Sequence, residues 1–266
     1  MIKIISRTVL CCLSVCMLVM ACTQQVFAAG TKKEFYQIKI YQLKNEEQVA
    51  RVDSFLREAY LPALHRAGIA KVGVFKPITN DTAAVKIIYV FTPFNSLQQL
   101  YALPAVLDKD QAFQQAGKNY LNAAYNNVPY IRIESVILDA FEKQTQFEVP
   151  KLSSSVKDKI YELRSYEGPT EKLYESKVRM FNAGDEVGLF KRLGFNAIFY
   201  ANVISGSHMP NLMYLTSFEN LQEREAHWKA FFDDPQWKKL LTIPEYQNTV
   251  SHADIILTHA TDYSDF

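Results

Sequence analysis

The chain has 266 residues, of which 48% are hydrophobic, 13% aromatic and 21% charged. This composition is typical of a globular protein and excludes a disordered or fibrous chain. The 29 Lys and Arg residues nearly balance the 28 Asp and Glu residues, for a net charge of +1. Without a basic excess, no nucleic-acid partner is expected.

Residues 1–28 are predicted to be an export signal peptide. Lys3 and Arg7 precede an apolar run, and the small residues Val26 and Ala28 suit a signal-peptidase cut after Ala28. The apolar run is shorter than the roughly 20 residues that span a bilayer, so no transmembrane span is predicted. The protein is therefore expected to be exported, either to a periplasm or to the medium.

A second processing route is open at the same segment. Val19-Met20-Ala21-Cys22 resembles a bacterial lipobox, in which Cys22 would carry a lipid and anchor the protein to a membrane. The four cysteines of the chain all precede Ala28, at Cys11, Cys12, Cys16 and Cys22. Cleavage after Ala28 would leave a mature protein without disulfides or thiolate ligands.

The rest of the chain contains an internal repeat. Four segments recur in the same order at an offset of 124 to 126 residues: Tyr36–Tyr41 with Tyr161–Tyr166, Arg66–Gly68 with Arg192–Gly194, Phe94–Leu97 with Phe218–Leu221, and Asp110–Phe113 with Asp234–Trp237. This pattern predicts a tandem duplication, with a first module at 34–141 and a second at 158–262. Residues 142–157 are polar and contain Pro150 and three serines, which indicates a linker.

Each module is predicted to follow the order β-α-β-β-α-β. The predicted elements are a strand (36–43; 160–166), a helix that ends at a glycine (46–66; 171–193), two strands (70–75 and 85–92; 196–204 and 212–217), a helical stretch (96–125; 220–242) and a last strand (131–138; 254–259). The expected fold class is α+β, as two tandem ferredoxin-like modules with both helices on one face of an antiparallel sheet.

The first strand of each module has two distinct rows of side chains. One row is predicted to pack under the helices: Tyr36, Ile38 and Ile40, matched by Tyr161, Leu163 and Ser165. The other row is predicted to cover the helix-free face: Gln37, Lys39 and Tyr41, matched by Glu162, Arg164 and Tyr166. Two such faces could pair and enclose a partly polar interior.

The second module resembles the NIPSNAP family of the dimeric α+β barrel superfamily. The resemblance rests on Tyr161–Tyr166, on His227-Trp228 with Phe231-Phe232, and on Asp233–Trp237. It runs more weakly over the first module, where Phe113 and Gln111 replace the Trp and the Pro. The resemblance implies that the two modules pair within the chain as one α+β barrel. It supplies no catalytic residues, and the superfamily includes haem-degrading monooxygenases and other small-molecule oxygenases.

The polar row is the predicted ligand site, formed by Glu162, Arg164, Tyr166, Lys39 and Tyr41. Arg164 offers a planar fork of donors to an anion, and Tyr166 offers a hydroxyl on an apolar ring. The expected partner is a small hydrophobic or anionic ligand, and a homo-oligomer is also open. The interpretation preferred over a ligand site is a salt-bridge and hydrogen-bond network that holds the two sheets together, because a sheet interface must satisfy its polar groups.

No metal site is predicted, because none of the five histidines has a metal-ligand spacing: His65, His208, His227, His252 and His259. No cofactor motif is evident, although a haem held by a single His is left open. The aromatic residues Trp228, Phe231, Phe232 and Trp237 are interpreted as core rather than as a stacking platform.

Three function classes follow, in order of preference. The first is an exported module that binds a small molecule or scaffolds a partner through the barrel. The second is an oxygenase or isomerase that acts on a hydrophobic or aromatic substrate in the barrel, with unknown catalytic residues. The third is a ligand-free protein that acts through a protein partner.

Overall fold

The computed structural model describes residues 32–266. The predicted signal peptide at 1–28 and the lipobox at Cys22 lie outside the described residues. No helix in the described part of the chain is long and apolar enough to cross a membrane.

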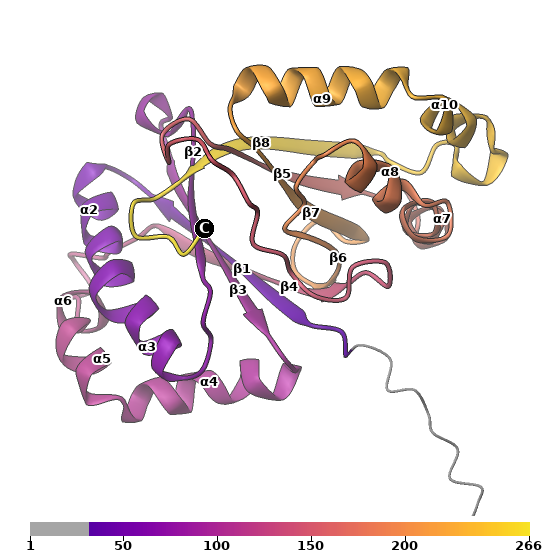
Figure 1. The fold of residues 1–266 in the computed structure, drawn as a ribbon. Helices are drawn as coiled ribbons and strands as arrows, with labels where there is room; N and C mark the ends of the chain where they lie inside the picture. Colours follow the sequence, from indigo (N-terminus) through magenta and orange to yellow (C-terminus); the bar gives the residue numbers. More distant parts are fainter. Residues whose placement is uncertain (1–31) are drawn as a thin grey trace, which may run out of the picture. The chain divides into compact units, whose positions relative to one another are not determined.

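The described chain alternates strands and helices in the predicted order (Figure 1). The first half contains β1 (Phe35–Leu43), α2 (Glu46–Phe55), η1 (Leu56–Tyr60), α3 (Leu61–Arg66), β2 (Gly73–Pro77), η2 (Asn80–Thr82), β3 (Lys86–Phe94), α4 (Leu97–Lys109), α5 (Gln111–Ala116), α6 (Lys118–Leu121) and β4 (Arg132–Ala140). The second half contains β5 (Ile160–Glu167), α7 (Glu171–Asn182), α8 (Glu186–Arg192), β6 (Phe199–Ser205), β7 (Asn211–Phe218), α9 (Leu221–Asp233), α10 (Pro235–Thr242), η3 (Pro244–Tyr246) and β8 (His252–Ala260).

The eight strands close into one antiparallel barrel in the order β1-β3-β2-β8-β5-β7-β6-β4. The halves are joined at two seams, where β2 pairs with β8 and β4 pairs with β6. The helices lie outside the barrel, those of the first half on one side and those of the second half on the other (Figure 1). Because a closed sheet has no free edge, every strand is hydrogen-bonded on both sides.

The same residues end and restart the helices in both halves. Asp110 caps α5 and Asp234 caps α10, and each accepts a hydrogen bond from a backbone N–H of its helix. Arg66 pairs with Asp110 at 2.7 Å and Arg192 pairs with Asp234 at 2.9 Å. A capping aspartate satisfies the free N–H groups of a new helix, which explains why each long predicted helix is divided here.

The barrel interior is apolar, which contradicts the predicted assignment of the two faces. Tyr36 and Ile38 of β1 pack inside the barrel with Tyr161 and Leu163 of β5, where Phe91 also lies. The other row faces the helices: Gln37, Lys39 and Tyr41 in the first half, and Glu162, Arg164 and Tyr166 in the second. The physical reason is closure: the face without helices is buried as completely as the other, so it needs side chains that require no polar partner.

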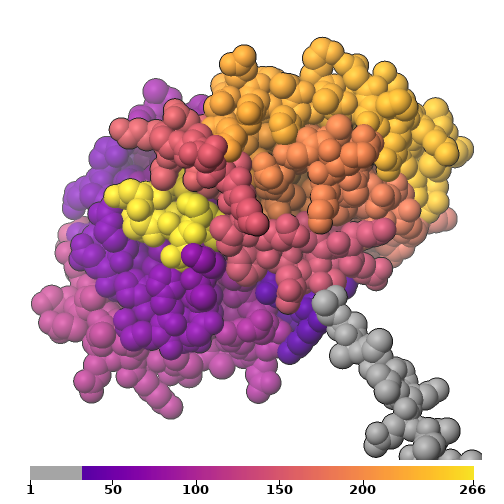
Figure 2. Space-filling model, in the orientation of Figure 1, coloured from indigo at the N-terminus to yellow at the C-terminus, as the bar shows by residue number. Residues whose placement is uncertain are grey.

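The C-terminal residues cross from the second half to the first and pack on its surface (Figure 2). Asp265 accepts a hydrogen bond from the backbone N–H of Val72 at 2.7 Å and pairs with His65 at 2.8 Å. The Phe266 ring packs at 6.0 Å, between centroids, from both Phe75 and Phe91. Since those two rings belong to the barrel interior, the C-terminus covers one end of the barrel.

A shared interior predicts that the two halves unfold together. Phe91 is 2% exposed and stacks on Phe199 of the other half at 5.0 Å between ring centroids. We expect Phe91→Ala to lower the free energy of unfolding by about 3–5 kcal/mol, because it opens a cavity in the barrel. Calorimetry should show a single transition for wild type and variant, whereas Tyr125→Ala, at a side chain 94% exposed, should leave the midpoint unchanged. Two resolved transitions would contradict the shared core.

Candidate functional site

The first half contains a cavity of about 390 Å³ between the outer face of β1 and the helical segments η1, α4, α5 and α6. Its walls are mainly apolar and aromatic: Phe55, Tyr60, Leu100, Tyr101, Leu103, Pro104, Leu107, Phe113, Tyr120, Leu121 and Ile133. Its polar lining residues are Gln37, Lys39, Tyr41 and Asp108. A large apolar concavity with a few polar groups is the usual form of a small-molecule site.

The polar groups of this cavity come from β1, from a π-helical turn and, for Asp108, from α4. Lys39 Nζ donates a hydrogen bond to the Tyr60 hydroxyl at 3.1 Å. Tyr60 is the last residue of η1, a π-helix that interrupts the predicted helix and was not expected from the sequence. Such turns occur often at functional sites, because the extra residue changes where a side chain points. Here the turn brings a phenol to the only cation that lines the cavity in the described residues.

Aromatic packing fixes the rest of the cavity wall. Phe55 and Tyr120 stack nearly parallel at 3.8 Å between ring centroids. Tyr41 is fully buried and meets Tyr120 edge-on at 6.5 Å. Burial, and then the neighbouring hydroxyls of Tyr120 and Tyr60, raise the pKa of Tyr41 well above its ordinary value. Tyr41 is therefore a neutral hydroxyl at any physiological pH.

In the second half, the corresponding space is filled by an indole. At the repeat offset, Lys39 corresponds to Arg164, Tyr41 to Tyr166 and Pro104 to Trp228. The Trp228 ring lies 3.6 Å from the Arg164 guanidinium carbon and is 5% exposed. A guanidinium over an indole face is a favourable cation–π contact, so this side of the barrel is closed by its own residues.

Glu162 is the centre of the network that closes the second half. Its carboxylate is fully buried and accepts hydrogen bonds from Arg164 Nε at 2.5 Å, Arg224 Nε at 2.7 Å and Trp228 Nε1 at 2.9 Å. Burial acts to raise the pKa of Glu162, but the Arg224, Arg164 and Trp228 donors together hold it below its ordinary value. Arg164 also donates to the Tyr166 hydroxyl at 2.8 Å.

The predicted site is therefore divided between the two halves. Lys39 and Tyr41 line the cavity of the first half, whereas Glu162, Arg164 and Tyr166 form a hydrogen-bonded network in the second. The two groups pack into separate cores on opposite sides of the barrel interior, so they do not meet. The alternative of a structural network describes the second group, but it joins β5 to α9 rather than one sheet to the other.

The barrel interior itself has little room for a ligand. Phe91 stacks on Phe199, and the gap that they leave with Ile38, Phe75 and Leu163 is about 10 Å³. That volume holds about one water molecule. The interior is therefore not partly polar, contrary to the prediction from the first strands, and a larger cavity of about 390 Å³ lies between the barrel and its helices.

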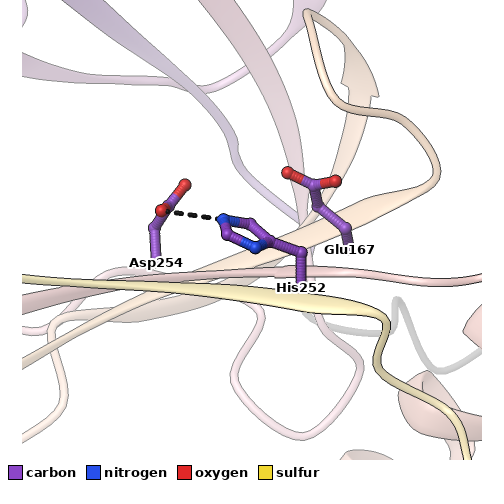
Figure 3. Close-up of side chains that lie close together, drawn as sticks. All are labelled: Glu167, His252 and Asp254. Atoms are coloured by element: carbon purple, nitrogen blue, oxygen red, sulfur yellow. Dashed lines mark hydrogen bonds and ion pairs between the residues drawn. The ribbon is translucent and has the colours of Figure 1, made fainter.

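A second group of polar side chains lies at one end of the barrel (Figure 3). One ligand atom each from Glu167, His252 and Asp254 lies within 4.8 Å of the others. His252 Nε2 is 3.1 Å from Asp254 Oδ1, as the dashed line in Figure 3 shows. Spacing along the sequence could not reveal this group, because pairing of β5 with β8 brings Glu167 opposite His252.

Comparison with known proteins identifies the second half. Residues 161–265 match the model of the NIPSNAP family, as the resemblance predicts, and form a NIPSNAP domain. Among curated protein sequences, no relative matches the chain.

Solved structures match most of the chain in fold. A "putative monooxygenase" from Lactobacillus acidophilus is 10% identical, with a TM-score of 0.54 over 86% of this chain and 94% of its own. A "putative monooxygenase" from Fusobacterium nucleatum is 7% identical, with a TM-score of 0.55 over 86% and 93%. An anthrone oxidase-like protein is 10% identical, with a TM-score of 0.50 over 87% and 93%. These similarities show that the chain has the same type of barrel.

The Glu162 network predicts a specific response to acid. Because the folded-state pKa of Glu162 is lowered from 4.5, its contribution to stability is present above that pH and is lost as the pH falls below it. We expect Glu162→Gln to cost about 3–5 kcal/mol at pH 7, since it leaves Arg164 and Arg224 without their carboxylate.

Denaturant unfolding between pH 7 and pH 3 tests this expectation. The difference in free energy between wild type and Glu162→Gln should shrink as the pH falls. Glu58→Gln, at an exposed glutamate on η1, is the matched control and should change little at any pH. A constant difference across the whole range would contradict the assignment.

Proposed function

We propose that this chain, whose second half is a NIPSNAP domain, binds a flat hydrophobic or aromatic molecule in the cavity of its first half. The observation that carries the proposal is the 390 Å³ cavity, in which Lys39 and Tyr60 form a polar end on apolar walls. Its volume lies within the roughly 300–1,000 Å³ range of ligand pockets. A ligand with an anionic or carbonyl oxygen would accept hydrogen bonds from the ammonium and the phenol.

The difference between the halves supports this choice of site. We infer that the halves are two ferredoxin-like modules derived from one ancestor, because their strand order, caps and matched segments correspond. In the second module, Trp228 covers the basic residue of the first strand. In the first module, Pro104 stands at that position and leaves Lys39 facing the cavity. The smaller side chain accounts for the open space.

A cofactor-independent oxidation of an aromatic substrate is the second candidate function. Two of the structural relatives carry the name of a monooxygenase and a third is described as anthrone oxidase-like. The cavity also fits one intermediate of such a reaction, because Lys39 and the hydroxyls of Tyr60 and Tyr41 would stabilise the oxyanion of a phenol or enol that has given its proton to a base in solution. Export, expected from residues 1–28, would place either function outside the cytoplasm.

Filling the cavity is the sharpest test of binding. We expect Pro104→Trp to place an indole against Lys39, as Trp228 lies against Arg164, and to abolish binding of 1-anilinonaphthalene-8-sulfonate, an aromatic anion used here as the probe. Pro104→Ala is the matched control, because it also removes the proline from α4 but leaves the cavity open. Fluorescence titration measures both.

Removing the cation should weaken the same binding. We expect Lys39→Met to raise the Kd of the probe about tenfold or more, since a hydrogen bond to a charged group is worth about 1.5–3 kcal/mol. Probe binding that survives Pro104→Trp unchanged would show that the cavity is not the site. No saturable binding by the wild type would favour the ligand-free alternative.

Oxygen consumption separates an enzyme from a binding protein. With anthrone as the test substrate, oxidation to anthraquinone consumes one O₂ and releases one water. If the second candidate is right, an oxygen electrode should record protein-dependent uptake that Pro104→Trp abolishes and Pro104→Ala retains. Saturable binding without uptake would leave the chain as a binding protein for this class of molecule.

A further inference from the structure

Three potential metal ligands, Glu167, His252 and Asp254, lie together at one end of the barrel, and a fourth, His208, contacts one of them. Glu167 ends β5, His252 and Asp254 begin β8, and His208 lies in the hairpin between β6 and β7. Glu167 Oε1 is 2.9 Å from His208 Nδ1, and His252 Nε2 is 3.1 Å from Asp254 Oδ1. The Glu167 carboxylate also lies within 4.8 Å of the His252 and Asp254 ligand atoms, so it lies next to both pairs (Figure 3).

Strand alternation places this group at the mouth of the barrel. His252 and Asp254 share a row of β8 with Ile256, which packs against the barrel interior. Glu167 lies two positions beyond Ser165 in the same row of β5 as Leu163, another interior residue. The side chains are therefore held by two paired strands rather than by a loose surface loop, and only His208 comes from a turn.

The carboxylate of Glu167 is the unusual member of the group. Its Oε1 atom is shielded from solvent and accepts no conventional hydrogen bond, so its polar contact in the described residues is the His208 ring nitrogen. A buried carboxylate oxygen is costly without a donor or a cation. The two histidines and Asp254 are about half exposed or more, which leaves the group open to an ion from solution.

We propose that Glu167, His252 and Asp254 bind one divalent transition-metal ion of the zinc type, with His208, which contacts Glu167 from the hairpin between β6 and β7, as the fourth ligand. Zinc is commonly held by four ligands at roughly 2.0–2.2 Å from nitrogen and carboxylate oxygen, which puts neighbouring ligand atoms a little over 3 Å apart. Two pairs, at 2.9 and 3.1 Å, have about this separation, and the ligand atoms of Glu167, His252 and Asp254, all within 4.8 Å of one another, would draw closer around an ion. Two imidazoles also favour zinc, nickel or copper over magnesium and calcium, which prefer ligand sets made of oxygen alone.

The site is independent of the proposed cavity. The cavity lies between β1 and the helices of the first half, whereas all four ligands belong to the second half. Loss of metal binding therefore leaves the aromatic-ligand proposal standing, and a cavity that fails to bind leaves the metal site standing.

Zinc titration of the full chain is the experiment. The protein should carry no histidine tag, and its cysteines at positions 11, 12, 16 and 22 should be alkylated, because thiolates also bind zinc. Competition with a chromogenic zinc indicator should give one ion per chain. We expect His252→Ala and Glu167→Gln each to weaken binding by about tenfold or more, and the His208→Ala/His252→Ala double variant to abolish it. Millimolar Mg²⁺ should not compete.

His65→Ala is the matched control, because His65 pairs with Asp265 in the C-terminal segment and should leave zinc affinity unchanged. Asp254→Asn, at an exposed side chain, provides a milder second variant if an alanine variant fails to fold. Zinc should also raise the thermal midpoint of the wild type but not of the double variant. Absence of saturable zinc binding by the wild type, or equal affinity in the double variant, would overturn the proposal.

Discussion

Closure of the barrel is the constraint on which the other features of this protein depend. Side chains alternate along a strand, and in a closed sheet wrapped by helices both rows are buried. The interior row has no partners other than itself, so it is apolar and close-packed around Phe91 and Phe199. The polar residues in the middle of the first strands, Lys39, Glu162 and Arg164, then lie under the helices, where a partner is within reach. The Glu162 network and the Lys39 cavity are two outcomes of this one requirement.

Much of the fold could be predicted from the sequence because its signals are local. The matched segments and the glycines that end the first helix of each half act within a few residues, and the structure shows a positive φ at Gly68 and Gly194. The direction of the two rows could not be predicted in this way. It depends on α9, which brings Arg224 and Trp228 to Glu162 from more than 60 positions along the chain. The polar residues on the first strands suggested a polar barrel interior because their partners on α9 could not be identified from the sequence.

The candidate sites escaped prediction for two different reasons. Lys39 and Tyr41 were recognised, but their partner Tyr60 depends on a π-helical turn that leaves no distinct pattern in the sequence. The group at the barrel mouth depends on register, because only the pairing of β5 with β8 sets Glu167 opposite His252. Metal motifs are read as short spacings along one segment, and ligands contributed by three segments have no such spacing.

The half that matches a family and the half that offers a cavity are different halves. Residues 161–265 keep the bulky residues that close the space over the sheet, and these same residues carry the NIPSNAP resemblance. In the first half, Pro104 stands at the position that corresponds to Trp228, and Lys39 lies over the Tyr60 ring instead, with its ammonium nitrogen 4.7 Å from the ring centroid. Tyr60 supplies one hydrogen bond to an ammonium that can donate three. The remaining donors of the Lys39 ammonium lie at a cavity with apolar walls, and this combination is the reason for proposing an aromatic anion as its ligand.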